Sequence, residues 1–287
     1  MVRHGAMGTV AAAGLLAALA GCDTGWNNTQ PPTAELGAPR GYMLARGIIH
    51  LHSPYSHDAC DGNGLPGGVV DESCYQDLRE ALCLNRIDFA MMTDHPAHMD
   101  EYEFSDLLLP RAGDVLLQGP YGPVANQMSC PNGHSPLVTV GFEDNLMPIG
   151  MTQHLDPDPI VRDDLYNGDG PALVDQLQTG ADALVMVAHT ESRSIDYLRT
   201  LGMDGIEIYN IHANLDPRGT VLGTVMPDVA RLIGAGFDGP HPDLAFTGIF
   251  RPGTAALETY DWTIARRRMP AFAGSDTHEN VPLPIDT

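Results

Sequence analysis

The chain has 287 residues, which is enough for one large α/β domain around a single core. Its 37 acidic and 15 basic residues give a net charge of −22, so it should repel nucleic acid, and no nucleic-acid partner is expected. All 15 basic residues are arginines, and the absence of lysine excludes Schiff-base chemistry and the phosphate-binding P-loop.

Residues 1–21 are expected to be a signal peptide rather than part of the fold. A weakly basic start at Arg3 precedes an apolar stretch over residues 7–19, which is too short to span a bilayer comfortably. The Leu-Ala-Gly-Cys sequence that ends at Cys22 resembles the lipobox of bacterial lipoproteins; an ordinary cleaved signal peptide is the alternative. The resemblance implies an exported protein that is anchored to a bacterial membrane, on its periplasmic face, through a lipid on Cys22.

The mature chain is expected to begin as a tether and to continue as one domain. Residues 22–41 are rich in Asn, Thr, Pro and Gly, which predicts a flexible linker, and residues 42–287 form the domain. Only nine residues follow His278, and they contain two prolines and no helical pattern. We therefore expect the domain to be cut short at its C-terminus, the alternative being a different closure of the fold.

Four cysteines follow Cys22, and an exported chain with an even number of cysteines is expected to form disulfides. Ser73 and Gln76 resemble a capping box, which predicts a helix over residues 74–85. Nine residues of helix would separate Cys74 from Cys83 by roughly 13 Å, too far for a disulfide. Two pairings remain open, 60–74 with 83–130 or 60–83 with 74–130. Zinc binding by these thiols is a further alternative, although the spacing matches no zinc finger.

Short apolar strands alternate with amphipathic helices from residue 46 onward. Strands are predicted over 46–50, 88–93, 137–141, 183–188, 205–209, 244–250 and 271–274, and helices over 74–85, 171–180, 194–201, 226–235 and 259–268. Residues 98–136 carry clusters of Gly, Pro and Asn and are interpreted as an insertion after the second strand. The alternation predicts a parallel sheet of seven strands that closes into a barrel.

Potential metal ligands stand at the ends of most of these strands. They are His50 and His52, Asp94 and His95, Glu143, His189, Asn210 and His212, and Asp276 and His278. Since the carboxyl ends of parallel strands meet at one rim, these side chains are expected to lie together. Neutral imidazoles and carboxylates are the ligand set of hydrolytic Zn, Mn or Fe sites.

Taken in order, these motifs resemble the PHP superfamily, the polymerase and histidinol phosphatase metallohydrolases. The resemblance covers residues 46–278: paired His with a Ser-His-Asp, then Thr-Asp-His, Glu, an isolated His, and Gly-Ser-Asp-Thr-His. It implies a distorted (β/α)7 barrel of the TIM type with two or three divalent metal ions at its rim. The implied ligands are His50, His52, Asp58, His95, Glu143, His154, His189, Asp276 and His278.

The resemblance also suggests how these ligands divide. One ion would use His50, His52, Glu143 and Asp276, a second Asp58 or His57 with His95 and His278, and a third Glu143, His154 and His189. Between His57 and Asp58 we prefer Asp58, and we interpret Asp94 as a carboxylate that orients a ligand. His57 or His212 is expected to protonate a leaving group, and Arg193, Arg218 or Arg251 to bind a phosphate.

The expected function is hydrolysis of a small-molecule ester by a metal-bridged hydroxide. A phosphoester is the first candidate substrate. A carboxylic or carbamic ester is the alternative, because the Ser-His-Asp and Gly-Ser-Asp-Thr-His motifs resemble those of the carbaryl-hydrolase branch. An alternative of another class is a lipoprotein that binds a metal or ligand without turnover.

Overall fold

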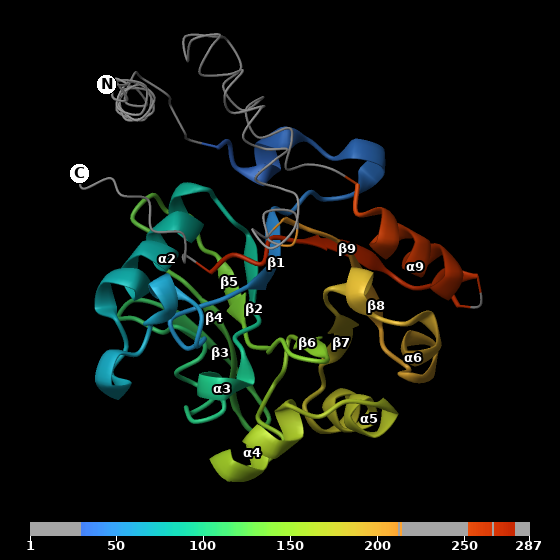
Figure 1. Cartoon of the computed structure of the whole chain (residues 1–287). Coiled ribbons are helices and arrows are strands. Elements are labelled where there is room, and N and C mark those ends of the chain that lie inside the picture. The colour runs from blue at the N-terminus through green and yellow to red at the C-terminus, as the bar shows by residue number, and fades with distance from the viewer. Residues whose placement is uncertain (1–29, 212, 214–251, 266, 279–287) are drawn as a thin grey trace, which may run out of the picture. The chain divides into compact units, whose positions relative to one another are not determined.

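The computed structural model describes residues 30–211, 213, 252–265 and 267–278 (Figure 1). Of these, residues 30–211, 252–265 and 267–278 belong to one compact unit, which contains all the elements named below. The predicted signal peptide, Cys22, the helix over 226–235 and the strand over 244–250 lie outside the described residues, as do His212, Arg218 and Arg251.

The described strands form two mixed sheets (Figure 1). The first has the order β1-β2-β5-β4-β3, with β1 (Gly47–Leu51), β2 (Phe89–Met92), β3 (Val115–Gly119), β4 (Gly122–Gln127) and β5 (Leu137–Thr139). The second has the order β6-β7-β8-β9, with β6 (Met147–Ile149), β7 (Leu184–Val187), β8 (Gly205–Asn210) and β9 (Ala271–Gly274). Strands β1, β2 and β5 are parallel to one another, and so are β7, β8 and β9.

The α/β class is therefore confirmed, but the closed parallel (β/α)7 barrel is wrong. The antiparallel hairpin β3–β4 extends the first sheet from within the predicted insertion, and β6 joins β7 antiparallel. The sheets meet at isolated bridges, Leu51 with Thr277 and Val140 with Met151, rather than through continuous ladders. At the first of these bridges His50 and Asp276 leave the extended conformation, with φ of 75° and 53°, and the register of β1 against β2 shifts between Ile49 and Leu51.

Helices cover both sheets. They are α2 (Glu72–Leu84), α3 (Pro96–Met99), α4 (Pro159–Tyr166), α5 (Pro171–Gly180), α6 (Ile195–Thr200) and α9 (Thr254–Ile264), with 3-10 turns η1 (Thr33–Leu36), η2 (Pro39–Gly41), η3 (Cys60–Gly62), η4 (Pro66–Gly68) and η5 (Thr190–Ser192). Helix α5 packs on β7, and α9, which connects the parallel strands β8 and β9, packs on β8. The four predicted helices that fall on described residues appear as α2, α5, α6 and α9.

Helix α2 begins earlier than its sequence pattern indicates. Asp71, not Ser73, is the N-cap, and its carboxylate accepts hydrogen bonds from the backbone N–H groups of Ser73 and Cys74. The helix places Cys74 in its first turn and Cys83 in its last. Each then meets a different partner, so that the disulfides are Cys60–Cys74 and Cys83–Cys130, the first of the two pairings left open.

The buried apolar residues form two clusters, a small one around Met147 and Met186 and a large one with residues from both sheets. The large cluster includes Met92 of β2 and Val185 of β7, and also the run Leu107–Leu109 of the predicted insertion, whose side chains are completely buried. The insertion is thus a packed part of the domain, and its burial of apolar surface stabilises the sheet that carries the first ligands.

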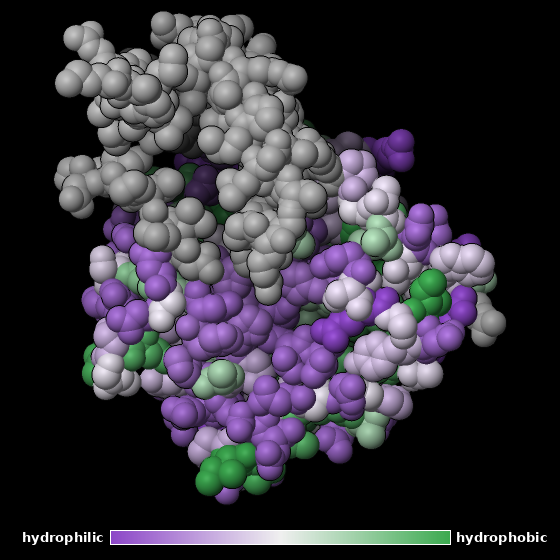
Figure 2. Space-filling model, viewed as in Figure 1, coloured by the Kyte–Doolittle hydropathy of each residue, from purple (hydrophilic) through white to green (hydrophobic). Residues whose placement is uncertain are grey.

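The visible face of the described residues is mostly hydrophilic, with apolar residues in small separate areas (Figure 2). No helix within the described ranges is long and apolar enough to cross a membrane. The two disulfides are of the kind that persists in an oxidising, extracellular environment.

Candidate metal centre

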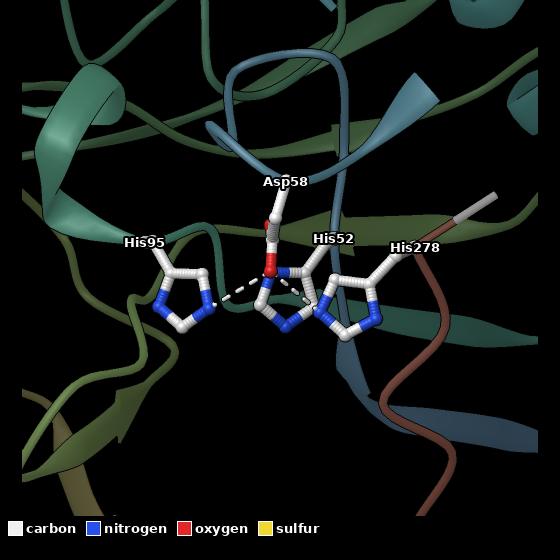
Figure 3. Close-up of side chains that lie close together, drawn as sticks. All are labelled: His52, Asp58, His95 and His278. Atoms are coloured by element: carbon white, nitrogen blue, oxygen red, sulfur yellow. Dashed lines mark ion pairs between the residues drawn. The ribbon is translucent and has the colours of Figure 1, made fainter. Parts of the chain in front are cut away.

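Four side chains from separate segments converge on one point (Figure 3). His52 follows β1, Asp58 lies in the loop after it, His95 follows β2 and His278 follows β9. Asp58 Oδ2 lies 2.9 Å from His278 Nε2 and 3.1 Å from His95 Nε2. One ligand atom from each of the four lies within 4.8 Å of all the others. We call these residues the Asp58 group.

A second convergence lies next to the first and consists of His50, Glu143, His189 and Asp276. His189 Nε2 lies 3.2 Å from Glu143 Oε1 and 3.2 Å from Asp276 Oδ2. His50 Nε2 lies 3.4 Å from Glu143 Oε2 and 3.3 Å from Asp276 Oδ1. We call these residues the Glu143 group; its ligand atoms also lie within 4.8 Å of one another.

Two carboxylates face both groups. Glu143 Oε2 lies 3.6 Å from His52 Nε2 and 3.4 Å from His95 Nε2 in the Asp58 group. Asp276 Oδ1 lies 3.4 Å from His52 Nε2 and 3.2 Å from His278 Nε2. The two groups therefore adjoin, and Glu143 and Asp276 contact imidazoles of both.

The backbone turns sharply at three ligands. His50, His189 and Asp276 have φ of 75°, 51° and 53°, in the left-handed region that residues other than glycine seldom adopt. Each such residue costs on the order of 1–3 kcal/mol, and residues of this kind cluster at functional sites. The turns direct the ligands of β1, β7 and β9 away from the sheets and toward one another.

Hydrogen bonds fix the orientation of three imidazoles. Nδ1 of His95 lies 2.7 Å from the backbone carbonyl of Glu143, and Nδ1 of His50 lies 2.9 Å from Glu207 Oε1. His52 Nδ1 lies 3.0 Å from Ser56 Oγ, which donates its own proton to Asp58. All three acceptors require a proton on Nδ1, and in the neutral ring the lone pair then lies on Nε2.

Two buried imidazole nitrogens without hydrogen-bond partners make the centre suitable for divalent cations. Nε2 of His50 and Nε2 of His52 are buried and make no hydrogen bond within the described part of the chain. Buried nitrogen atoms without partners destabilise a fold unless a ligand satisfies them. Imidazole nitrogens beside ionised carboxylates suit Zn, Mn or Fe, so the two groups are able to hold metal ions.

The charged groups of the centre shift one another's pKa. Burial opposes the effect, but close contacts with His278 and His95 hold the pKa of Asp58 well below its usual range, and close contacts with His189 and His50 do the same for Glu143. At His189 and His95 burial lowers the pKa, but the neighbouring carboxylates outweigh it. Asp276 and Glu143 raise the pKa of His189 to about 12, and Asp58 raises that of His95 to about 9. Without a cation, protonated imidazoles thus lie between ionised carboxylates.

The structure brings together eight of the nine predicted ligands but divides them differently. His52 lies in the Asp58 group rather than with His50, and His189 joins His50 in the Glu143 group. The predicted third set is not brought together, because His154 lies elsewhere. Its Nδ1 is 3.0 Å from the hydroxyl of Tyr166 and its Nε2 is 3.0 Å from the carbonyl oxygen of Tyr102.

The remaining predicted residues lie around the centre. The exposed His57 has its ring centroid 4.8 Å from that of His95. Arg193 contacts Asn145 Oδ1 at 3.2 Å and so joins the segment after β7 to the segment after Glu143. Asp94 accepts hydrogen bonds from the backbone N–H and the hydroxyl of Ser53, next to His52, and burial raises its pKa to about 6. Asp94 thus contacts the residue that follows His52 in the chain, and its role in orienting a ligand stays a prediction.

Sequence reasoning missed Glu207, which contacts His50 and the backbone N–H of His189. Its place in the sequence is the middle of an apolar strand. A signal was present, because a carboxylate in the middle of a strand buried on both faces needs a partner. Ser56 was also missed, although it lies between the two predicted ligands His52 and Asp58.

No protein-family model, no curated protein and no solved structure matches the chain. A functional assignment for this protein therefore depends on the geometry of the two ligand groups.

Removal of the Cys60–Cys74 disulfide is expected to weaken metal binding. This bond closes a 14-residue separation beside Asp58, and the backbone N–H of Cys60 donates to the carbonyl of His278 at 2.9 Å. A C60S/C74S variant should lose about 3 kcal/mol of stability and about tenfold or more of its zinc affinity at the Asp58 group. Calorimetric zinc titration measures the second effect.

The matched control is the C83S/C130S variant. Its disulfide spans a separation of 47 residues, so its loss should cost about 4 kcal/mol. Because neither cysteine adjoins a ligand in the chain, zinc affinity should stay at the wild-type value. Equal zinc affinities in the two double variants would contradict the role given to the Cys60–Cys74 bond.

Proposed function

We propose that the protein is a metal-dependent hydrolase, with phosphoesters as its first candidate substrates. The observation that carries the proposal is the pair of adjoining ligand groups that share Glu143 and Asp276. Two divalent ions held there would supply Lewis acidity and activate water near neutral pH. The relationship to the PHP metallohydrolases is also a proposal, and it rests on the order of the ligand motifs alone.

The protein's own residues would bind and orient the substrate. Arg193, four residues after His189, donates two of its terminal N–H groups to Asn145 Oδ1 and to the carbonyl of Asp144, which follows Glu143 in the chain. Its remaining donors suit a phosphoryl oxygen. Burial lowers the pKa of His57, and His95 and His98 lower it further although Asp58 opposes them. At neutral pH His57 is therefore better suited to accept a proton than to donate one.

A carboxylic or carbamic ester is the second candidate substrate. The observation that favours it is the negative charge beside the centre: Glu191 lies 3.3 Å from Nδ1 of His189, and the chain as a whole carries −22. Such surroundings favour an uncharged ester over a phosphate dianion. Binding of metal without turnover is the third candidate.

A substrate panel distinguishes these functions. The full chain is loaded with Mn²⁺ or Zn²⁺ and assayed with para-nitrophenyl phosphate, bis-para-nitrophenyl phosphate and a naphthyl ester. Hydrolysis of the phosphates that disappears with a chelator supports a phosphoesterase, and hydrolysis of the naphthyl ester alone supports the second candidate. Metal binding without hydrolysis of any substrate would contradict both enzymatic functions.

We also propose that the enzyme acts outside the cytoplasm, anchored through a lipid on Cys22. The two disulfides and the lipobox-like sequence support this location. A Cys22→Ala variant expressed in a bacterial host should move from the membrane fraction to the soluble fraction, and wild-type protein should carry a diacylglyceryl mass on its first mature residue. A wild-type protein without that mass would contradict the anchor.

A further inference from the structure

Glu207 of β8 connects the ends of three strands. It is only 1% exposed. Its Oε1 lies 2.9 Å from Nδ1 of His50, at the end of β1. Its Oε2 accepts hydrogen bonds from the backbone N–H of His189, after β7, at 2.9 Å, and from the side-chain amide of Asn210 at 3.1 Å. One buried carboxylate thus contacts two ligands of the Glu143 group.

The acceptor chemistry of Glu207 determines which nitrogen of His50 carries a proton. An ionised carboxylate only accepts hydrogen bonds, so Nδ1 of His50 must donate to Oε1. In the neutral imidazole the lone pair is then on Nε2. Nε2 lies between Glu143 Oε2 and Asp276 Oδ1, at 3.4 and 3.3 Å, where a cation would sit.

Gly274 of β9 makes this contact possible. A Cβ atom at this position would lie 1.8 Å from Glu207 Oε1 and 3.1 Å from the Cβ of His50. Gly274 is not among the glycines with positive φ, so its backbone conformation is open to any residue. Glycine is therefore required here because a larger side chain would not fit beside Glu207, where Glu207 approaches His50.

We propose that Glu207, seated against Gly274, is a positioning residue that holds His50 in the tautomer that binds metal and so controls occupancy of the Glu143 group. The Asp58 group does not depend on it, because His52 and His95 are oriented by Ser56 and by the carbonyl of Glu143 instead. This inference rests on the proposed metal centre. It adds that Glu207 controls metal occupancy of the Glu143 group without affecting the Asp58 group.

The Glu207→Gln variant is the sharpest test, because it keeps the shape of the side chain. The Oε2 position receives two donors, so the single oxygen of glutamine is expected to occupy it. The amide NH₂ would then face His50 and donate to Nδ1, which moves the ring proton to Nε2. With that nitrogen protonated, His50 cannot bind a metal, and zinc affinity at the Glu143 group should fall by about 100-fold.

The measurements are a zinc count and the tautomer of His50. After dialysis against limiting free zinc, native mass spectrometry should find two ions in the wild-type full chain and one in Glu207→Gln. Nitrogen-15 shifts of the imidazoles, recorded at alkaline pH without metal, should place the His50 proton on Nδ1 in the wild type and on Nε2 in the variant. A residue with a purely structural role would move neither quantity.

Gly274→Ala tests the same contact from the other strand. Its methyl group should displace Glu207 and also reduce the zinc count to one. The variant that carries both Glu207→Gln and Gly274→Ala should bind zinc almost as tightly as the weaker of the two single variants, because both changes break the same contact between Glu207 and His50. Gly253→Ala is the matched control, because a Cβ there meets its nearest atom at an ordinary 3.4 Å; Glu258→Gln, on the exposed face of α9, controls for the loss of a carboxylate.

The outcomes separate this inference from the proposed function. Two zinc ions and an unchanged His50 tautomer in Glu207→Gln would overturn the role of Glu207 and leave the metal centre intact. A wild-type protein that binds no metal would overturn the proposed function; the tautomer of His50 in the two metal-free proteins would then decide whether Glu207 orients the ring. Loss of both ions in Glu207→Gln with an intact fold would overturn the selectivity.

Discussion

Replacement of Glu143 by glutamine is expected to reduce kcat/KM by on the order of 10³-fold or more, equivalent to about 4 kcal/mol. The side chain is buried, and its two oxygens face different neighbours: Oε1 contacts His189, and Oε2 contacts His50 and His95. An amide carries no charge and offers one oxygen, so it cannot bridge two cations. We therefore expect weaker metal binding at both groups, in contrast to Glu207→Gln.

The matched control for Glu143→Gln is Glu258→Gln, the same change on the exposed face of α9. It should keep wild-type kcat/KM and two zinc ions. Circular dichroism and thermal unfolding establish whether both variants are folded. A Glu143→Gln protein that hydrolyses substrate at the wild-type rate with two bound ions would show that the bridging position is not used.

Metal uptake is expected to release protons and to become tighter as the pH rises. In the metal-free protein burial opposes protonation, but Asp276, Glu143 and Glu207 raise the pKa of His50 well above its ordinary value, and the pKa values of His95 and His189 are raised to about 9 and about 12. At pH 7 these three imidazoles hold protons that ligation must displace. Asp58, Glu143 and His52 release none, because their pKa values are lowered and they are already deprotonated.

About three protons should therefore leave when both groups fill at pH 7. Zinc titrations in buffers with different enthalpies of ionisation count these protons, and a series from pH 6 to pH 8 should show affinity rising by about tenfold per pH unit for each proton displaced. Removal of the metal with a chelator should abolish hydrolysis, and reloading should restore it. Uptake that releases no protons would mean that the imidazoles are not the ligands.

Local patterns were sufficient to predict most elements and most candidate ligands. Apolar runs predicted the strands β1, β2, β5, β7, β8 and β9, because a strand that is buried on both faces needs a continuous apolar segment. Candidate ligands were recognisable from their place after such runs, where a chain leaves a sheet. Both patterns depend on residues that are close in sequence, so they are the same whatever the arrangement of the sheets.

The pairing of the strands and the grouping of the ligands could not be predicted in this way. Whether β6 pairs antiparallel with β7, and whether the hairpin β3–β4 extends the first sheet, depends on contacts between distant segments. The resemblance to the PHP superfamily implied that His50 and His52 bind one ion. His50 adopts a positive φ, so the two rings turn toward different groups.

The sequence by itself determined the α/β class and the acidic character, because local apolar pattern and composition determine these properties, and its motifs indicated the eight residues that the structure groups together. Only the tertiary structure decided which cysteines pair, which ligands share a group and what Glu207 contacts. These depend on where β1, β7, β8 and β9 end relative to one another in space. That arrangement results from the packing of the whole core, in which Gly274 leaves the space that Glu207 occupies.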